Sequence, residues 1–176
     1  MRATVPVKLK NAGFHPMPKP INWDISHKVA AMVGAKVAHC AENASRALLN
    51  HESELPSGTR YVEGAWLPNP NLDAEPHAWL ETPDYMIDPT ADVYGAVAVY
   101  VRVADFSRER VAAHVAESEG KLQPILVDDP RVNHALCLLD EPHARHTRSG
   151  KDCGCRKMTR DQVAEPFTPD DYLRSL

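Results

Sequence analysis

Fifteen prolines are spread along this 176-residue chain, and they constrain its fold more than any other feature. A proline inside a helix removes a backbone hydrogen bond and clashes with the preceding turn, so long helices cannot hold many of them. The prolines therefore exclude a bundle of long helices and predict a loop-rich mixture of helices and strands. A chain of this length fits one domain and can bury a sizeable core.

The composition excludes several classes of protein. Hydrophobic residues make up 43% of the chain and charged residues 25%, which is ordinary for a soluble globular protein. The net charge of -4 provides no general attraction to nucleic acid, so we do not expect a dedicated nucleic-acid partner. The N-terminal residues contain no apolar run like that of a signal peptide, and no stretch approaches the roughly 18 consecutive apolar residues of a membrane span. We therefore expect a cytoplasmic protein with no membrane partner.

Hydrophobic spacing and turn signals predict helices on either side of a set of short strands. The expected elements are two helices within 25–50 separated near Gly34, strands over 60–67, 77–81, 85–88 and 96–103, a helix over 107–118 between a Ser107 cap and a Gly120 stop, and a strand and a short helix within 121–140. This order predicts the α+β class, with a helix packed on one antiparallel sheet. We expect one domain over residues 1–140, with an extended lead-in over 1–24, and a polar, basic tail over 141–176.

The segment from His77 to Asp88 carries the most informative spacing. If it forms a hairpin whose loop of two or four residues is centred just before Pro83, then Glu81 faces Asp84 and His77 faces Asp88. Facing residues share one side of the sheet, with Cβ atoms about 4.5–5.5 Å apart, so the carboxylate can hold the imidazole in one tautomer. A four-residue loop is favoured over a two-residue loop, because proline fits a two-residue hairpin turn poorly. A three-residue loop would shift the register and break this pairing.

Cys40 is the candidate nucleophile. A thiol enzyme needs a thiolate, a base beside it and a group that orients the base. Cys40 lies where the second helical piece begins, and the helix dipole favours a thiolate there, while a backbone N–H of the first turn can stabilise an oxyanion. In a reducing compartment cysteines are thiols or metal ligands more often than disulfides. The chain has four of them: Cys40, Cys137, Cys153 and Cys155.

Several short motifs, within roughly residues 35–105, resemble those of the papain-like and transglutaminase-like cysteine enzymes. They are Cys40-Ala-Glu-Asn43-Ala, Tyr61-Val-Glu-Gly64, His77-Ala-Trp79, Ile87-Asp88-Pro89-Thr90 and Tyr94-Gly95. In that superfamily a helix-borne cysteine precedes a histidine and an aspartate on adjacent strands. The resemblance implies a helix carrying Cys40 packed against an antiparallel sheet carrying His77 and Asp88.

The same resemblance implies roles for these residues. Cys40 is the nucleophile, His77 the general base and Asp88 the group that orients His77. The superfamily contains peptidases, amidases, transglutaminases and acyl transferases, so the reaction can be hydrolysis or transfer. We expect acyl transfer through a Cys40 thioester on an amide or ester carbonyl of a protein, a peptide or a small amide, without a cofactor. No glutamine stands just upstream of Cys40 to complete a papain-type oxyanion hole.

Three further residues are candidates for the cleft or for substrate binding. Asn43, one turn after Cys40, either takes part in the chemistry or only hydrogen-bonds a neighbouring loop. Glu63 either lines the cleft or is a solvated strand residue, and we favour the solvated residue. Trp79 is either a platform for the substrate or a core residue, and we favour the core. Gly64 is expected to meet a backbone requirement.

The C-terminal part of the chain offers a rival site. Zinc prefers thiolate and imidazole ligands, and several such residues lie within a short span, although Cys-x-Cys and His-x-x-His are tighter than the usual spacings. The candidates are Cys137, His143, His146, Cys153 and Cys155. Residues 145–160 also carry six Lys or Arg side chains against one Asp. This run contacts an anionic surface or nucleic acid, or else it is a solvated tail holding free thiols, which we favour.

Two other functions therefore remain as alternatives to an enzyme. One is a non-catalytic binding or adaptor module on the same fold, in which the three site residues are structural. The other is a zinc-stabilised nucleic-acid adaptor built on the tail. A compact domain of this kind would suit a phage or bacterial accessory protein, whereas its oligomeric state has no signal in the sequence.

Overall fold

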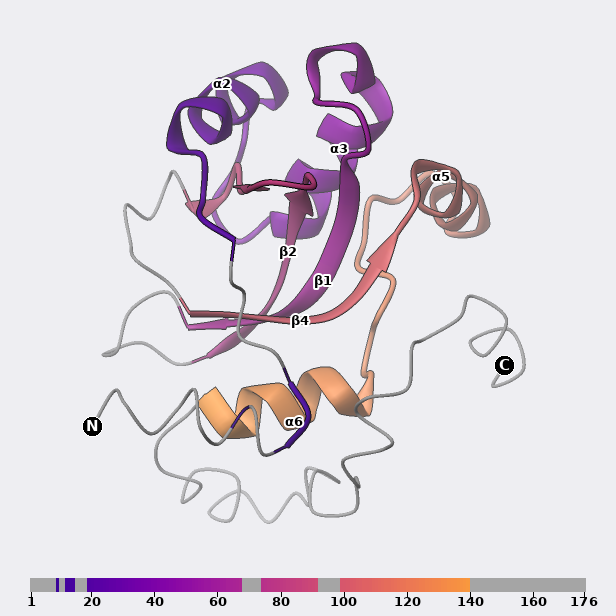
Figure 1. Ribbon diagram of the computed structural model, residues 1–176. Coiled ribbons are helices and arrows are strands. Elements are labelled where there is room, and N and C mark those ends of the chain that lie inside the picture. The colour runs from indigo at the N-terminus through magenta and orange to yellow at the C-terminus, as the bar shows by residue number, and fades with distance from the viewer. Residues whose placement is uncertain (1–8, 10–11, 15–18, 68–73, 92–98, 140–176) are drawn as a thin grey trace.

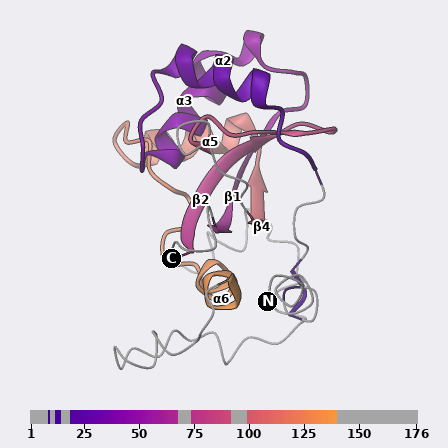
Figure 2. The same cartoon turned by 90° about the vertical axis from the view of Figure 1, so that its left-hand side faces the viewer.

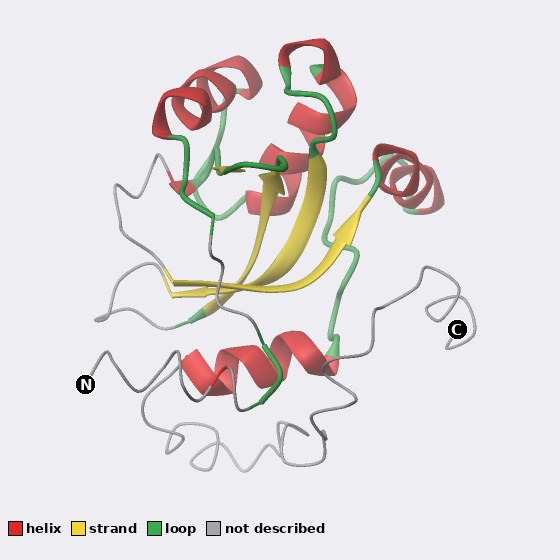
Figure 3. Cartoon of the chain, viewed as in Figure 1, coloured by secondary structure: helices red, strands yellow, loops and turns green. Residues whose placement is uncertain are grey.

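The computed structural model describes residues 9, 12–14, 19–67, 74–91 and 99–139. Its described elements are α2 (Trp23–Val33), α3 (Cys40–Asn50), the 3-10 turn η1 (Glu52–Glu54), β1 (Arg60–Leu67), β2 (Glu75–Glu81), β3 (Met86–Ile87), β4 (Val99–Phe106), α5 (Arg108–Glu117) and α6 (Pro130–Leu139). The strands form one sheet in the order β3-β2-β1-β4, and the neighbouring strands are antiparallel. The predicted α+β class is confirmed (Figure 3).

α2 ends, and α5 begins, where the sequence predicts. The Asn22 side chain accepts a hydrogen bond from the Ile25 N–H at the start of α2, and Gly34 ends that helix in the left-handed conformation, with φ 61°. Ser107 caps α5 by accepting a hydrogen bond from the Arg110 N–H. These side chains satisfy amides that the first helical turn leaves without a partner.

Several predicted boundaries are wrong. β2 begins at Glu75, two residues early, and β4 continues to Phe106, while 96–98 lie outside the described residues. The strand expected within 121–140 is absent from the described part of that segment, where a loop leads into α6. The predicted lead-in over 1–24 ends too late, since α2 already begins at Trp23. The predicted tail, 141–176, lies outside the described residues.

The hairpin between β2 and β3 has the predicted four-residue loop but not the predicted register. Glu81 pairs with Met86 instead of facing Asp84. Thr82 sets the loop, because its N–H donates to the Tyr85 carbonyl at 2.9 Å and its hydroxyl accepts the N–H groups of Asp84 and Tyr85. The register differs by two residues, and an even shift leaves every side chain on its predicted face.

The helices cover the sheet at two ends. α3 packs on β2 and β1 together with α2 and α5, whereas α6 packs across β1, β2 and β4. In both Figure 1 and Figure 2, α2 and α3 lie beyond one end of the strands and α6 beyond the other. Each fully buried aliphatic or aromatic side chain in these layers contributes about 1.5–3 kcal/mol. No helix within the described ranges is long and apolar enough to cross a membrane.

A second buried cluster lies on the opposite face of the sheet from the residues that face α3. Its members come from all four strands and the segment after β3: Val62, Trp66, Trp79, Met86, Ala91 and Tyr100.

A bulge in the β1–β4 ladder falls between Glu63 and Gly64. A Cβ atom at Gly64 would lie 2.0 Å from the Val101 carbonyl oxygen, so only glycine fits there. On its other side Gly64 pairs with His77, which brings His77 into this aromatic cluster.

Candidate active site

Cys40 is the first residue of α3 and is half-buried. A tight turn precedes it, in which the His39 N–H donates to the Lys36 carbonyl and Ala38 takes a left-handed φ of 62°. A side chain other than glycine is strained in that conformation. The residue before the helix, His39, makes no side-chain cap. The N–H groups of the first turn of α3 are therefore not taken by a capping side chain, and they lie beside the Cys40 thiol.

Asn43 holds the turn in front of Cys40. Its Oδ1 accepts the Lys36 N–H at 3.1 Å and its Nδ2 donates to the Lys36 carbonyl at 2.8 Å. The same Nδ2 donates to Thr90 Oγ1 at 3.0 Å, which ties α3 to the segment after β3. Asn43 is buried and acts as a bridge between two loops, which matches the second of the two roles predicted for it.

The predicted contact between His77 and Asp88 is present. His77 Nε2 lies 2.7 Å from Asp88 Oδ2, and both side chains are buried. The other carboxylate oxygen, Oδ1, accepts the N–H groups of Thr90 and Ala91 at 2.8 and 3.0 Å. Tyr100 donates its hydroxyl to Oδ2 at 2.7 Å. Asp88 therefore accepts four hydrogen bonds, two at each oxygen.

Aromatic rings enclose the His77 imidazole. The Trp66 ring stacks on it with centroids 3.7 Å apart and planes 7° apart. Trp79 stacks at 6.1 Å, and Tyr100 lies at 5.8 Å and is tilted. This packing fixes the plane of the imidazole, and its bond to Asp88 leaves Nδ1 as the second nitrogen available for chemistry.

The sequence reasoning missed three of the residues around this pair: Ser26, Trp66 and Tyr100. Trp66 had a usable signal, since it lies two residues after Gly64 and therefore shares the face of β1 that is paired with His77. Ser26 accepts the Asp88 N–H at 3.0 Å from the first turn of α2, a contact across 62 positions that no local pattern indicates.

The electrostatics favour a charged pair. Burial lowers the pKa of His77, but the Asp88 charge, the hydrogen bond to Asp88 and the interaction with the Cys40 thiol together raise it to about 9 from 6.5. The Cys40 thiol is thus near enough to the His77 ring to affect its pKa. Burial raises the pKa of Asp88, and the His77 charge with hydrogen bonds from His77, Ala91 and Tyr100 outweighs it and leaves this pKa below its usual value. Near neutral pH the pair is imidazolium and carboxylate.

The sequence favoured a solvated strand residue at Glu63, and this prediction is wrong. Glu63 is buried, with its carboxylate accepting the Tyr61 hydroxyl at 2.6 Å and the N–H groups of Ile125 and Leu126 at 2.7 Å each. Burial raises its pKa, although the three hydrogen bonds oppose that rise. Glu63 fastens the loop before α6 to the sheet, so we do not carry it into the proposed chemistry. Trp79 is fully buried, as expected of a core residue.

The rival metal site cannot be assembled from the described residues. Cys137 is buried in α6, and His143, His146, Cys153 and Cys155 lie outside the described ranges. Among the residues with described positions, no three His, Cys, Asp or Glu side chains are grouped to hold a metal ion.

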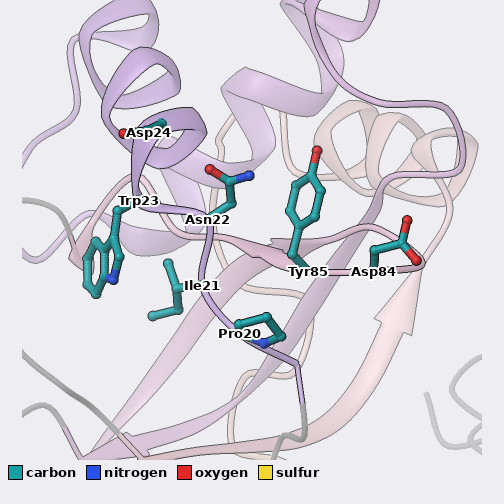
Figure 4. Close-up of a pocket in the computed structure, with 7 residues that line it drawn as sticks. All are labelled: Pro20, Ile21, Asn22, Trp23, Asp24, Asp84 and Tyr85. Atoms are coloured by element: carbon teal, nitrogen blue, oxygen red, sulfur yellow. The ribbon is translucent and has the colours of Figure 1, made fainter.

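A shallow pocket of about 470 Å³ opens at the start of α2 (Figure 4). Its lining comes from the segment before and into α2 and from the hairpin loop: Pro20, Ile21, Asn22, Trp23, Asp24, Asp84 and Tyr85. The Asn22 carbonyl accepts the Ser26 hydroxyl that in turn accepts the Asp88 N–H, so the first turn of α2 separates the pocket from Asp88. Cys40, His77 and Asp88 do not line it, and we assign it no part in the chemistry.

Comparisons with models of known families, with curated proteins and with solved structures find no match to this chain. The resemblance to papain-like and transglutaminase-like enzymes therefore depends on the sequence motifs alone.

Proposed function

We propose that this protein is a cysteine-dependent acyl-transfer enzyme in which Cys40 is the nucleophile, His77 the acid and base, and Asp88 the residue that orients His77. One observation carries the proposal: the buried Asp88 carboxylate holds His77 Nε2 at 2.7 Å, and the Cys40 thiol lies near enough to the same ring to raise its pKa. A thiol beside such a pair is the arrangement that nucleophilic catalysis requires. On this proposal α3 and the sheet form a papain-like or transglutaminase-like core.

The proposed reaction has two halves. The Cys40 thiolate attacks the carbonyl carbon of an amide or ester, a C–S bond forms, and the carbonyl oxygen becomes an oxyanion. His77 then gives its proton to the leaving nitrogen or oxygen as the bond to carbon breaks, which leaves a thioester on Cys40. Water or an amine attacks the thioester and returns a proton to His77, and the thiolate leaves.

The electrostatics support these roles. With its pKa raised to about 9, His77 carries at neutral pH the proton that the leaving group needs. Asp88 remains a carboxylate and acts on the ring by orientation and charge, since its four hydrogen bonds all stabilise the ionised form.

The start of α3 supports stabilisation of the oxyanion. His39 provides no side-chain cap, so the first amides of α3 remain available beside the thiol. Hydrogen-bond donors aimed at a developing oxyanion are commonly the largest single contribution to such catalysis, at about 2.7–4 kcal/mol for one donor. This supply of backbone N–H groups compensates for the absence of an upstream glutamine.

The deciding experiment measures acylation of the thiol. The protein is incubated with p-nitrophenyl acetate at pH 7.5, and peptide mass spectrometry locates the acetyl group. We expect rapid acetylation of Cys40, slower by a hundredfold or so in His77→Gln, because the variant loses the imidazolium that stands beside the thiolate and protonates the leaving group. Buried Cys137 provides an internal control. Equal, slow acetylation of Cys40 in both proteins would leave the non-catalytic binding module as the better description.

A further inference from the structure

Tyr100 and His77 share one acceptor atom. The Tyr100 hydroxyl and His77 Nε2 both lie 2.7 Å from Asp88 Oδ2, and the Tyr100 side chain is buried against Trp66, Trp79 and His77. Tyr100 reaches this atom from β4, at the far edge of the sheet from β3.

The carboxylate cannot turn away from this arrangement. Its other oxygen, Oδ1, is fixed by the Thr90 and Ala91 N–H groups, so rotation of the Asp88 carboxyl would break two backbone hydrogen bonds. Both donors at Oδ2 must therefore draw on the same negative charge. Each hydrogen bond that a carboxylate accepts stabilises its charge and weakens its pull on the others.

We propose that Tyr100 is a positioning residue that sets the acidity of His77, by competing with the imidazole for Asp88 Oδ2. This inference rests on the proposed function of the same site. With the hydroxyl in place, Asp88 holds the imidazole in line and still allows it to release its proton to the leaving group. Without the hydroxyl, the Asp88 charge would stabilise the imidazolium more strongly, and the ring would release the proton on its other nitrogen, Nδ1, less readily.

The groups that can affect the charge of His77 come from several elements. They are Cys40 at the start of α3, Asp88 after β3 and Tyr100 on β4, while β1 contributes the uncharged Trp66 and Gly64. Burial and the Asp88 charge raise the pKa of Tyr100, so its hydroxyl stays a neutral donor through the working range of pH.

The test compares two tyrosines. Tyr100→Phe keeps the ring and removes only the hydroxyl. Tyr61→Phe is the matched control, because Tyr61 is also buried and its hydroxyl also donates to a buried carboxylate, at 2.6 Å to Glu63. Both variants lose one comparable hydrogen bond, so both should lose similar stability. Only Tyr100→Phe should change how His77 titrates.

The readout is the titration of the His77 ring, followed by NMR from pH 6 to pH 11, with the signal assigned by its loss in His77→Gln. We expect the midpoint to rise by about half a pH unit or more in Tyr100→Phe, on the scale of one lost hydrogen bond. Tyr61→Phe should keep the midpoint of the parent protein. An unchanged midpoint in Tyr100→Phe, or an equal shift in both variants, would overturn the inference.

Acetylation of Cys40 separates this inference from the proposed function. If the parent protein is acetylated at Cys40 but the His77 midpoint does not move in Tyr100→Phe, the Tyr100 role fails and the enzyme stands. If the midpoint moves and the high-pH limb of the acetylation profile moves with it, the positioning role is supported. If Cys40 is never acetylated faster than in His77→Gln, the proposed function fails, and a role for Tyr100 in its chemistry fails with it.

Discussion

The helix that carries Cys40 begins differently from its neighbours. α2 and α5 each start with a side chain, Asn22 or Ser107, that accepts an N–H of the first turn. α3 starts after His39, which makes no such bond, and after Ala38, which takes a left-handed backbone. An N-cap typically stabilises a helix by about 1 kcal/mol, and a left-handed residue other than glycine costs about as much.

On the proposed function, the two kinds of helix start serve different purposes. At α2 and α5 the amides are used for stability, and the fold gains from both caps. At α3 the first-turn amides have no capping side chain and lie beside a thiol. The missing cap at His39 and the left-handed Ala38 both lower stability at this one helix start. Local strain held in position by surrounding contacts is typical of functional sites, and here Asn43 supplies the contacts by binding both backbone groups of Lys36.

The largest effect should come from removing the thiol. Cys40→Ala should lose acyl transfer completely and keep its unfolding midpoint within a degree or two, because the side chain is half-buried at a helix start. Turnover of p-nitrophenyl acetate measures acyl transfer, and circular dichroism during heating measures the unfolding midpoint. Retained turnover in a well-folded Cys40→Ala protein would refute the nucleophile assignment and remove any functional reason for the open start of α3.

A second prediction concerns the stability of the pair behind the thiol. The folded pKa of His77, about 9, is above the unfolded value of 6.5, so its contribution is complete below pH 6.5 and is lost as pH rises to 9. Urea unfolding should show a loss of about 3 kcal/mol over that window, which His77→Gln abolishes.

His114 on α5 is the control for this measurement. Burial, with the Arg110 charge, lowers the pKa of His114, so its contribution is present above pH 6.5 and is lost only as pH falls further. His114→Gln should therefore keep the loss of stability between pH 6.5 and pH 9. A wild-type protein with no such loss would show that His77 is not held as a cation.

These outcomes depend on contacts that the sequence predicted only in part. The pairing of His77 with Asp88 was predicted from alternation along a hairpin. It holds although Thr82 shifts the register, because a shift of two residues keeps the faces. The cap at Ser107 and the helix end at Gly34 were also predicted, since both depend on local backbone chemistry.

Other parts of the site depend on contacts that local patterns cannot indicate. Tyr100 reaches Asp88 through a ladder with a bulge, and the bulge shifts the register between β1 and β4. Glu63 is satisfied by amides of Ile125 and Leu126, more than sixty positions away, so its burial could not be read from the alternation of a strand. The sequence therefore predicted contacts made within one hairpin and missed those made across the sheet.

A third prediction exchanges the two kinds of helix start. His39→Ser should add a cap to α3, raise the free energy of unfolding by about 1 kcal/mol and slow acetylation of Cys40 about tenfold, because the new hydroxyl occupies a first-turn amide. Ser107→Ala should lower the free energy of unfolding by about 1 kcal/mol and leave acetylation unchanged. Urea unfolding and acetylation kinetics give both values. A capped α3 that remains fully active would show that its open amides have no part in the reaction.

The smallest effect should come from the strained residue itself. Ala38→Gly relieves the left-handed strain but loosens the unfolded chain, so we expect a gain of only about 0.5 kcal/mol in the free energy of unfolding. Glu119→Gly is the matched control, since Glu119 also has a left-handed φ, of 57°, but follows α5 and is far along the chain from the thiol. Both variants should gain similar stability. Acetylation of Cys40 should not change in either variant if the Asn43 bonds to Lys36 alone hold the turn. A slower reaction in Ala38→Gly only would mean that a rigid turn, and not merely an uncapped helix, is what places Cys40 against His77.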